Sequence, residues 1–448
     1  MGAEVEPETV ARLRPDSSTD AFLGFEHEDV EVSEVPGGGK TREPTAHDDD
    51  IDVDHSVILA ARVPRMVARE AAFPLGAAAT LEELEADPHP LLARLREREP
   101  VTWLAALDGW VVTRRDLALE VMRDAETFTV DDPRFSTGQV VGRSMLTTDG
   151  AEHDRHRDPF ARRFRLDEVR REFETIVAAE TDRLIDAFEP AGRAELRREL
   201  AGPLAVAAVL HSLGLGAADG GEVLGWYDRI VAAVTEIEAG RPAGADGAEA
   251  FASLSAAVEP NLVDVGGLSV REAVSNAAVL MFGGIETTEA MIANAFFHLL
   301  SNPDQLALVL SDPGLLPGAI EESLRLEPAA AVIDRYATRD VELAGAPIGQ
   351  RELVTISLAG ANRDPAVFAE PDRFDVRRPN VRVQLAFAQG PHVCVGMHLA
   401  RMEALTAVGR SLERLPGLRL SEPTAPRGLV FRKPPAVNVR WDTALHES

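Results

Sequence analysis

The sequence contains a single cysteine and no long apolar run. With one cysteine among 448 residues, no disulfide can form within the chain, and no zinc or iron–sulfur site can be built from several cysteines. No run of about 18 apolar residues occurs, and the N-terminus lacks a basic segment followed by an apolar one. We therefore expect neither a membrane-spanning helix nor a signal peptide, and the sequence predicts a cytoplasmic protein without a membrane partner.

Positive charge is scarce as well. The chain has 46 Lys+Arg against 74 Asp+Glu, a formal net charge of −28 at pH 7, and Lys40 and Lys433 are its only lysines. A net charge of this sign argues against a nucleic-acid partner and favours solubility. The hydrophobic share of 45% and the charged share of 27% are ordinary for a globular protein with a sizeable core.

The first 75 residues differ in composition from the rest of the chain. Residues 1–54 carry 16 Asp+Glu and 4 Lys+Arg, and they include Gly37-Gly-Gly39 and Asp48-Asp-Asp50. We interpret residues 1–75 as an acidic, weakly ordered N-terminal extension. The alternative is an arm that packs on the body or recruits a partner, because residues 57–66 are apolar enough to dock. We expect the catalytic domain to span residues 76–448.

Beyond the extension, the patterns predict a mainly helical chain with a few strands. We expect a long loop over residues 128–146, helix through 165–215 and an apolar helix over 274–300. The remaining expectations are helices at 81–99 (broken by Pro88 and Pro90), 117–123, within 220–262 and ending near 415, with strands at 101–104, 109–113 and 354–358.

The lone cysteine lies in the stretch Phe387-Ala-Gln-Gly-Pro-His-Val-Cys-Val-Gly396. A lone cysteine is by default an inert, buried small hydrophobe. Here Gly390 and Gly396 flank the sulfur, and their missing side chains allow backbone to approach something flat and bulky. A helical pattern begins at Met397, so Cys394 precedes a helix N-terminus, whose dipole favours the thiolate. This combination points to a thiolate ligand of haem iron.

Three further patterns pair polar residues at helical spacing. His153 and Arg157 stand four apart, which by itself usually indicates a solvated basic face. Glu322 and Arg325 stand three apart on a helix that Pro328 ends.

The third pattern lies in the apolar helix, where Gly283-Gly284 precedes Glu286-Thr287. Close helix packing is one explanation for the two glycines. The other is a local opening of the helix, because Thr287 Oγ1 can reach the carbonyl of Gly283 four residues back.

The cysteine stretch resembles the haem-ligand loop of the cytochrome P-450 family, Phe-Gly-x-Gly-x-His/Arg-x-Cys-x-Gly, with Ala388 in place of the first glycine. Five motifs similar to those of the family follow in its order over residues 150–396. The resemblance implies a mainly α fold, a single triangular-prism-like domain. It also implies a small β subdomain built from residues 100–115, 335–360 and 420–442.

The resemblance also implies a role for each motif. Cys394 becomes the axial ligand of haem b, Thr287 holds dioxygen in a groove at Gly283-Gly284, and Glu286 helps to deliver protons. For the haem propionates and the ligand loop it implies His153, Arg157, Arg335, His392, Phe387, Gly390 and Gly396. For the buried structural pair and its third member it implies Glu322, Arg325 and Arg373, and for the substrate pocket Val279, Phe282, Ala331, Val332, Ile333 and Phe431.

The activity implied is haem-thiolate monooxygenation, in which one oxygen atom from O2 enters an apolar organic small molecule by hydroxylation or epoxidation, with secondary metabolism as one setting. The electron source implied is a ferredoxin or flavodoxin with an NAD(P)H reductase. A peroxide-driven peroxygenase and a non-catalytic haem-binding protein are the alternatives. Both would keep Cys394, but neither needs Glu286 and Thr287.

Several arginines of this acidic chain gather near motifs on the cysteine side of the expected haem. They are either scattered solvated arginines or a positive patch that steers an acidic electron donor. The arginines are Arg155, Arg162, Arg163, Arg377, Arg378 and Arg401.

Overall fold

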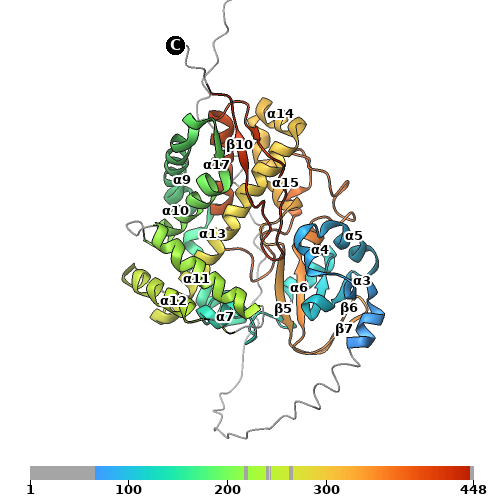
Figure 1. Cartoon of the computed structure of the whole chain (residues 1–448). Helices are drawn as coiled ribbons and strands as arrows, with labels where there is room; N and C mark the ends of the chain where they lie inside the picture. The colour runs from blue at the N-terminus through green and yellow to red at the C-terminus, as the bar shows by residue number, and fades with distance from the viewer. Residues whose placement is uncertain (1–65, 216–219, 239–241, 243, 262–265, 444–448) are drawn as a thin grey trace, which may run out of the picture. The chain divides into compact units, whose positions relative to one another are not determined.

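The computed structural model describes residues 66–215, 220–238, 242, 244–261 and 266–443 (Figure 1). The chain divides into the units Met1–Ala61 and Arg62–Ser448, and every described residue belongs to the second. Residues 1–65 of the predicted N-terminal extension lie outside the described residues. Within the described part, no helix is long and apolar enough to cross a membrane.

Most of the second unit is a helical body around one long central helix, α13 (Val270–Ser301). This helix packs against α10, α12, α15 and α17 and is buried along most of its length. The other helices of the body are α7 (Ser136–Val141), α8 (Gly150–Ala161), α9 (Leu166–Phe188), α10 (Gly202–Ser212), α11 (Gly220–Glu238), α12 (Ala245–Val258), α14 (Pro303–Ser311), α15 (Leu316–Leu326) and α17 (Met397–Arg414).

Local sequence explains where α13 begins and ends. Ser269 caps its N-terminus: the hydroxyl accepts the N–H of Glu272, and the Glu272 carboxylate accepts the N–H of Ser269 (2.8 Å), which is a capping box. The helix ends at Ser301, where Asn302 and Pro303 follow, because the residue before a proline avoids helical geometry.

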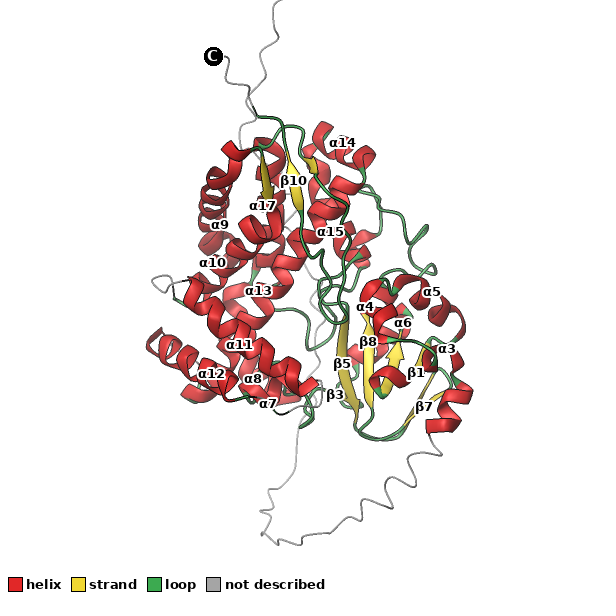
Figure 2. Ribbon diagram, in the orientation of Figure 1, coloured by secondary structure: helices red, strands yellow, loops and turns green. Residues whose placement is uncertain are grey.

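A five-stranded sheet forms the main β part, in the order β1-β2-β8-β5-β3. Only the β2–β8 pair is parallel. Figure 2 shows β1, β8 and β5 with α3–α6 beside them. The strands are β1 (Val101–Leu104), β2 (Gly109–Val112), β3 (Phe128–Thr129), β5 (Val332–Ala337) and β8 (Leu353–Ser357). The short helices are α3 (Pro74–Ala77), α4 (Leu81–Ala86), α5 (His89–Arg98), α6 (Arg115–Arg123) and α16 (Leu358–Ala361).

Two expectations about the strands need correction. The segment 420–442 does not join the main sheet. Its strand β10 (Asn438–Arg440) pairs with β9 (Arg419–Leu420) and with β4 (Arg193–Glu195) in a separate sheet. The helix expected over 165–215 is also interrupted. Pro190 and Gly192, the latter at φ +67°, follow the end of α9, and β4 comes next in the chain. The remaining two-stranded sheet joins β6 (Val341–Leu343) and β7 (Ala346–Ile348).

Other boundaries shift by smaller amounts. The expected loop over 128–146 contains β3 and α7. Residues 66–72, which we placed in the extension, are helical and contact the body. There the Nη2 of Arg69 lies 2.6 Å from Oε1 of Glu352, and its guanidinium stacks over the rings of Trp103 and Trp110 at 4.4 and 5.1 Å. The globular part therefore begins before residue 76.

Candidate active site

Cys394 lies three residues before the first residue of α17. Its N–H donates to the carbonyl of Phe387 (2.9 Å), and this bond closes the loop that carries the cysteine. The side chain is exposed, although protein packed around it desolvates the sulfur. This desolvation raises the pKa of the Cys394 thiol, while the N–H of Gly396 and the charges of Arg157 and Arg401 lower it.

Desolvation is the largest of these effects on the thiol pKa. A bound metal cation would reverse the balance by coordinating the sulfur.

The two glycines around Cys394 serve different purposes. Gly390 adopts φ +78°, and a Cβ there would lie 2.5 Å from the carbonyl oxygen of Met122 at the end of α6. Packing against α6 therefore explains Gly390. At Gly396 a Cβ would meet no atom within 4 Å, so only this glycine borders open space. Ala388, in the position of the family's first glycine, keeps the left-handed geometry at φ +59°, which costs roughly 1–2 kcal/mol for a residue with a Cβ.

The glycine pair of α13 divides in the same way. A Cβ on Gly284 would lie 2.6 Å from Cγ2 of Val209 on α10, so close helix packing explains this residue. A Cβ on Gly283 would meet nothing within 4 Å. The Thr287 hydroxyl donates to the carbonyl of Gly283, as its spacing predicted. A carbonyl that accepts a side-chain hydroxyl and free space thus occur together on one turn of α13.

Glu286, next to this turn, has two partners that the sequence patterns did not identify. The hydroxyl of Tyr227 on α11 donates to its Oε2 (3.1 Å), and the ammonium of Lys433 lies 2.7 Å from its Oε1. The rarity of lysine in this chain was the only sequence signal that could have singled out Lys433.

The predicted haem-binding donors come from two elements, α8 and β5. On α8, a ring nitrogen of His153 lies 3.1 Å from the carbonyl oxygen of Pro391, and Arg157 donates to the carbonyl of Val393 (2.7 Å). On β5, Arg335 donates to the carbonyl of Asp334 (2.7 Å). The structure therefore brings His153 and Arg157 to the cysteine loop, as predicted.

The charges of these arginines test whether the fold suits a haem. Desolvation lowers the pKa of both Arg157 and Arg335, and Arg335 is buried. Among the described residues, neither guanidinium has a carboxylate within ion-pair distance. Buried cations bonded only to neutral carbonyls are costly unless an anion joins them. Two haem propionates would supply such anions, so the donor set fits the cofactor.

His392 has a carboxylate partner within the protein. Its Nε2 lies 2.7 Å from Oδ1 of Asp149, the residue just before α8, and its ring lies 4.3 Å from that of His153. Burial raises the pKa of Asp149, but hydrogen bonds from His392, the Thr129 hydroxyl and the Val130 N–H outweigh it and hold the pKa at about 2. The sequence patterns did not identify Asp149 as a functional residue.

The buried pair on α15 has a different third member from the one predicted. Arg325 donates to both carboxylate oxygens of Glu322 (2.7 and 2.8 Å), and Arg378 donates to them as well (2.9 and 3.0 Å). Arg373 instead pairs with Glu370, and its side chain is 55% exposed. The assignment of Arg373 is therefore wrong: only its backbone carbonyl reaches the cluster, where it accepts from Arg325 and Arg378.

Comparisons with known proteins agree with this geometry. The cytochrome P-450 family model matches residues 310–423. The cytochrome P-450 monooxygenase PikC of Streptomyces venezuelae is 34% identical over 395 residues, which cover 80% of this chain and 92% of PikC. The chain belongs to the cytochrome P-450 family.

Other relatives of this P-450 extend the comparison. The 6-deoxyerythronolide B hydroxylase of Saccharopolyspora erythraea is 31% identical over 380 residues, covering 76% of this chain and 93% of the hydroxylase. The crystal structure of CalO2 matches with a TM-score of 0.74 at 30% identity, over 81% of this chain and 99% of CalO2. The predicted fold class, cofactor and activity are confirmed: the protein is a haem-thiolate monooxygenase that uses haem b, a redox partner and a small-molecule substrate.

Two of the residues predicted to line the substrate pocket are aromatic and lie side by side. The rings of Phe282 on α13 and Phe431 lie 5.6 Å apart, and Tyr227 lies 6.5 Å from Phe282. Val279 is half-buried in the same apolar cluster as Phe282.

The β5 candidates divide. Val332 is half-buried, and Ile333 packs against the core of the main sheet. Ala331, which directly precedes β5, is buried and packs with Leu92 and Ala359, and its place in the pocket stays a prediction.

The predicted arginine patch is largely neutralised. Arg155 pairs with Glu272, Arg163 with Glu172, and Arg401 with Glu321. Arg378 is buried against Glu322, as described above. Only Arg162 and Arg377 of the six are exposed.

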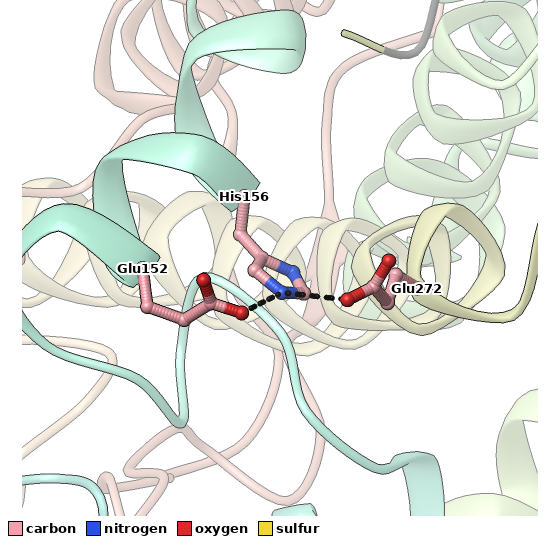
Figure 3. A group of neighbouring side chains, drawn as sticks. All are labelled: Glu152, His156 and Glu272. Atoms are coloured by element: carbon pink, nitrogen blue, oxygen red, sulfur yellow. Dashed lines mark ion pairs between the residues drawn. The ribbon is translucent and has the colours of Figure 1, made fainter. Parts of the chain in front are cut away.

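One cluster outside the haem site resembles a metal centre. Glu152, His156 and Glu272 bring ligand atoms within 4.8 Å of one another (Figure 3). The Nη2 of Arg155, however, already lies 2.7 and 2.5 Å from the two carboxylates. Asn276 donates to Nδ1 of His156 (2.8 Å), so the neutral ring carries its proton on Nε2, the atom that faces the carboxylates. The cluster is an ion-pair network that links α8 to α13.

Proposed function

We propose that this P-450 hydroxylates or epoxidises an apolar small molecule. Cys394 is the axial ligand of the haem iron, and Thr287 and Glu286 deliver the protons that the reaction consumes. The observation that carries the proposal is the turn of α13 in which Thr287 bonds to the Gly283 carbonyl beside open space. When bound, the haem supplies the activation of dioxygen. A peroxide-driven enzyme or a haem carrier has no need for this acid and hydroxyl.

Each residue contributes a separate task. Arg157 and Arg335 bind the propionates, because the half-buried charge of Arg157 and the buried charge of Arg335 donate only to carbonyls. The Gly396 N–H points at the sulfur of Cys394 and stabilises its anionic form. The Thr287 hydroxyl, fixed as a donor to Gly283, keeps its lone pairs free to accept a proton-bearing partner in the open space. Glu286 takes up protons from solvent and transfers them towards Thr287.

The substrate class follows from the aromatic wall and from the relatives. Phe282 and Phe431 offer an apolar surface without a charged group of their own. Relatives include PikC, the 6-deoxyerythronolide B hydroxylase and a pentalenic acid synthase of Streptomyces avermitilis. These names support an apolar product of secondary metabolism as substrate.

Turnover under two electron regimes tests the proposal. The purified enzyme is given a substrate that perturbs its spectrum, with either an NAD(P)H-driven donor system or hydrogen peroxide alone. We expect oxygen-18 from O2 in the product with the donor system and little product with peroxide. Efficient turnover by peroxide alone would identify a peroxygenase, and spectral binding without any product would identify a carrier.

For electron supply we propose a cytoplasmic ferredoxin or flavodoxin with an NAD(P)H reductase. Arg162 and Arg377 are the two exposed members of the predicted arginine patch, which an acidic partner can meet. Reversing both to glutamate should slow the first electron transfer at low salt and leave substrate binding unchanged. Reversing Arg183 on α9, which is 63% exposed, is the matched control. Equal rates in both variants would place the docking surface elsewhere.

A further inference from the structure

Lys433 is the only lysine in the described part of the chain, and it does not lie free on the surface. Its side chain is 15% exposed. Its ammonium lies 2.7 Å from Oε1 of Glu286 and 3.1 Å from Oε1 of Glu289, both on α13. Glu289 also pairs with Arg197 (2.5 Å). Two carboxylates and two cations therefore alternate beside the turn that carries Thr287.

The neighbouring Arg432 fixes the backbone from which Lys433 extends. Arg432 is 2% exposed, and its Nε lies 2.5 Å from Oε1 of Glu327. Its guanidinium also donates to four backbone carbonyls, those of Leu84, Glu85, Pro426 and Gly428. Adjacent side chains of an extended segment point to opposite sides. Arg432 thus anchors one side of the segment and Lys433 faces α13 from the other.

The choice of lysine in a chain of arginines has a physical reason. A guanidinium is a rigid planar fork that suits one carboxylate bidentately, whereas an ammonium is a compact charge with three rotatable donors. At this position one cation serves carboxylates three residues apart on a helix, which fits the ammonium. The same compact group can follow Glu286 as its carboxylate turns.

We propose that Lys433 is a positioning residue for the reaction: it holds the Glu286 carboxylate ionised and oriented towards Tyr227, and so sets the pH range in which Glu286 passes protons towards Thr287. This inference rests on the proposed proton role of Glu286. In each cycle Glu286 takes a proton from solvent, gives it up towards Thr287, and returns to the carboxylate that Lys433 binds.

The surrounding charges support this role. The groups that face Glu286 are Lys433 from the C-terminal segment, Tyr227 from α11 and Glu289 from its own helix, with Arg197 beyond Glu289. Burial and the nearby Glu286 raise the pKa of Tyr227, so its hydroxyl remains a donor. Without the ammonium, two carboxylates would share one cation, which favours protonation of one of them.

A lysine-selective NMR measurement tests the contact without relying on turnover. Haem-bound protein labelled with carbon-13 at lysine Cε shows two signals, because the chain has two lysines, and Lys433→Arg assigns them. We expect the Lys433 signal to shift in acid as its carboxylate partner is protonated, and Glu286→Gln to abolish most of that shift. A Lys433 signal that matches free lysine at every pH, in the parent and in Glu286→Gln, would overturn the proposal.

The pH dependence of coupling tests the consequence. Lys433→Met should move the pH of half-maximal coupling, measured as product per NAD(P)H, upward by about one unit. Lys433→Arg should shift it less, and Glu289→Gln should shift it downward because the ammonium then serves Glu286 alone. An unchanged midpoint in both Lys433→Met and Glu289→Gln would refute the role. If Glu286→Gln itself leaves coupling intact, the proton role of Glu286 fails, whatever the NMR signal shows.

Discussion

The Nε of Arg378 lies 2.9 Å from Oε1 of Glu322, in a site where both side chains are almost completely buried. Arg325 bonds to the same carboxylate, so one buried anion holds two cations from α15 and from the segment before the cysteine loop. The Arg378 guanidinium also donates to the carbonyls of Ala369, Glu370 and Arg373. Removing it would leave these acceptors and the Glu322 carboxylate short of a buried donor. The arrangement explains how the segment that precedes the cysteine loop is fixed to α15.

Arg378→Ala should destabilise the protein by roughly 2–4 kcal/mol, because several buried acceptors lose their donor. Arg373→Ala, five residues away, removes an exposed pair with Glu370 and should cost at most about 1 kcal/mol. Urea unfolding of both variants, with haem content as a second readout, measures the difference. Equal costs would contradict the assignment of Arg378 and restore that of Arg373.

Thr287→Ala should keep haem binding and substrate affinity while product per electron pair falls several-fold and peroxide accumulates. The reason is the loss of the hydroxyl that bonds to Gly283. Thr287→Ser keeps a hydroxyl at the same place and is the matched control, expected to retain most of the coupling. Full coupling in Thr287→Ala would show that Thr287 has only a structural role in α13 and none in proton delivery.

Gly390→Ala and Gly396→Ala separate two reasons for a glycine. Alanine at position 390 has an unfavourable positive φ and would contact the Met122 carbonyl, so this variant should lose stability even without haem. Alanine at position 396 meets no protein atom within 4 Å, so this variant should fold normally as the apoprotein and bind haem less well. Thermal unfolding of the apoproteins and haem titration measure the two effects. A destabilised Gly396→Ala apoprotein would show that protein packing, not the cofactor, requires this glycine.

His298 makes stability depend on pH. Burial lowers its pKa to about 3 from the ordinary 6.5, so the ring is neutral in the fold, beside the Ser323 hydroxyl (2.9 Å). The unfolded chain binds a proton below pH 6.5, so this contribution to stability is full above pH 6.5 and falls as the pH drops towards 3. The loss is about 1.4 kcal/mol per pH unit.

His298→Gln should remove that slope. Urea unfolding of the parent and the variant between pH 7 and about 5 checks it, because groups common to both proteins cancel in the difference. A parallel decline in the two proteins would mean that His298 accepts a proton within the fold.

The comparison of sequence and structure separates local from long-range information. Thr287 and Gly283 lie one helical turn apart, so their hydrogen bond was predictable from spacing. The reasons for Gly284 and Gly390 were not, because Val209 and Met122 are remote in sequence and meet them only in the fold.

Burial decided the other cases. Arg373 and Arg378 lie in one arginine-containing segment, and only tertiary packing shows which guanidinium turns inward. The contact between Lys433 and Glu286 could not be predicted either, because the two residues are remote in sequence and meet only in the fold. The fold class needed less information, because helical periodicity and the cysteine loop are local patterns.

The central claim is that Cys394 holds the haem iron through its sulfur. The most direct test is the absorption spectrum of the reduced carbon-monoxide complex of the purified protein, recorded beside Cys394→His. We predict the red-shifted Soret band of thiolate ligation for the parent and a band at shorter wavelength for the variant. A parent spectrum of the histidine type, with haem fully bound, would contradict the account.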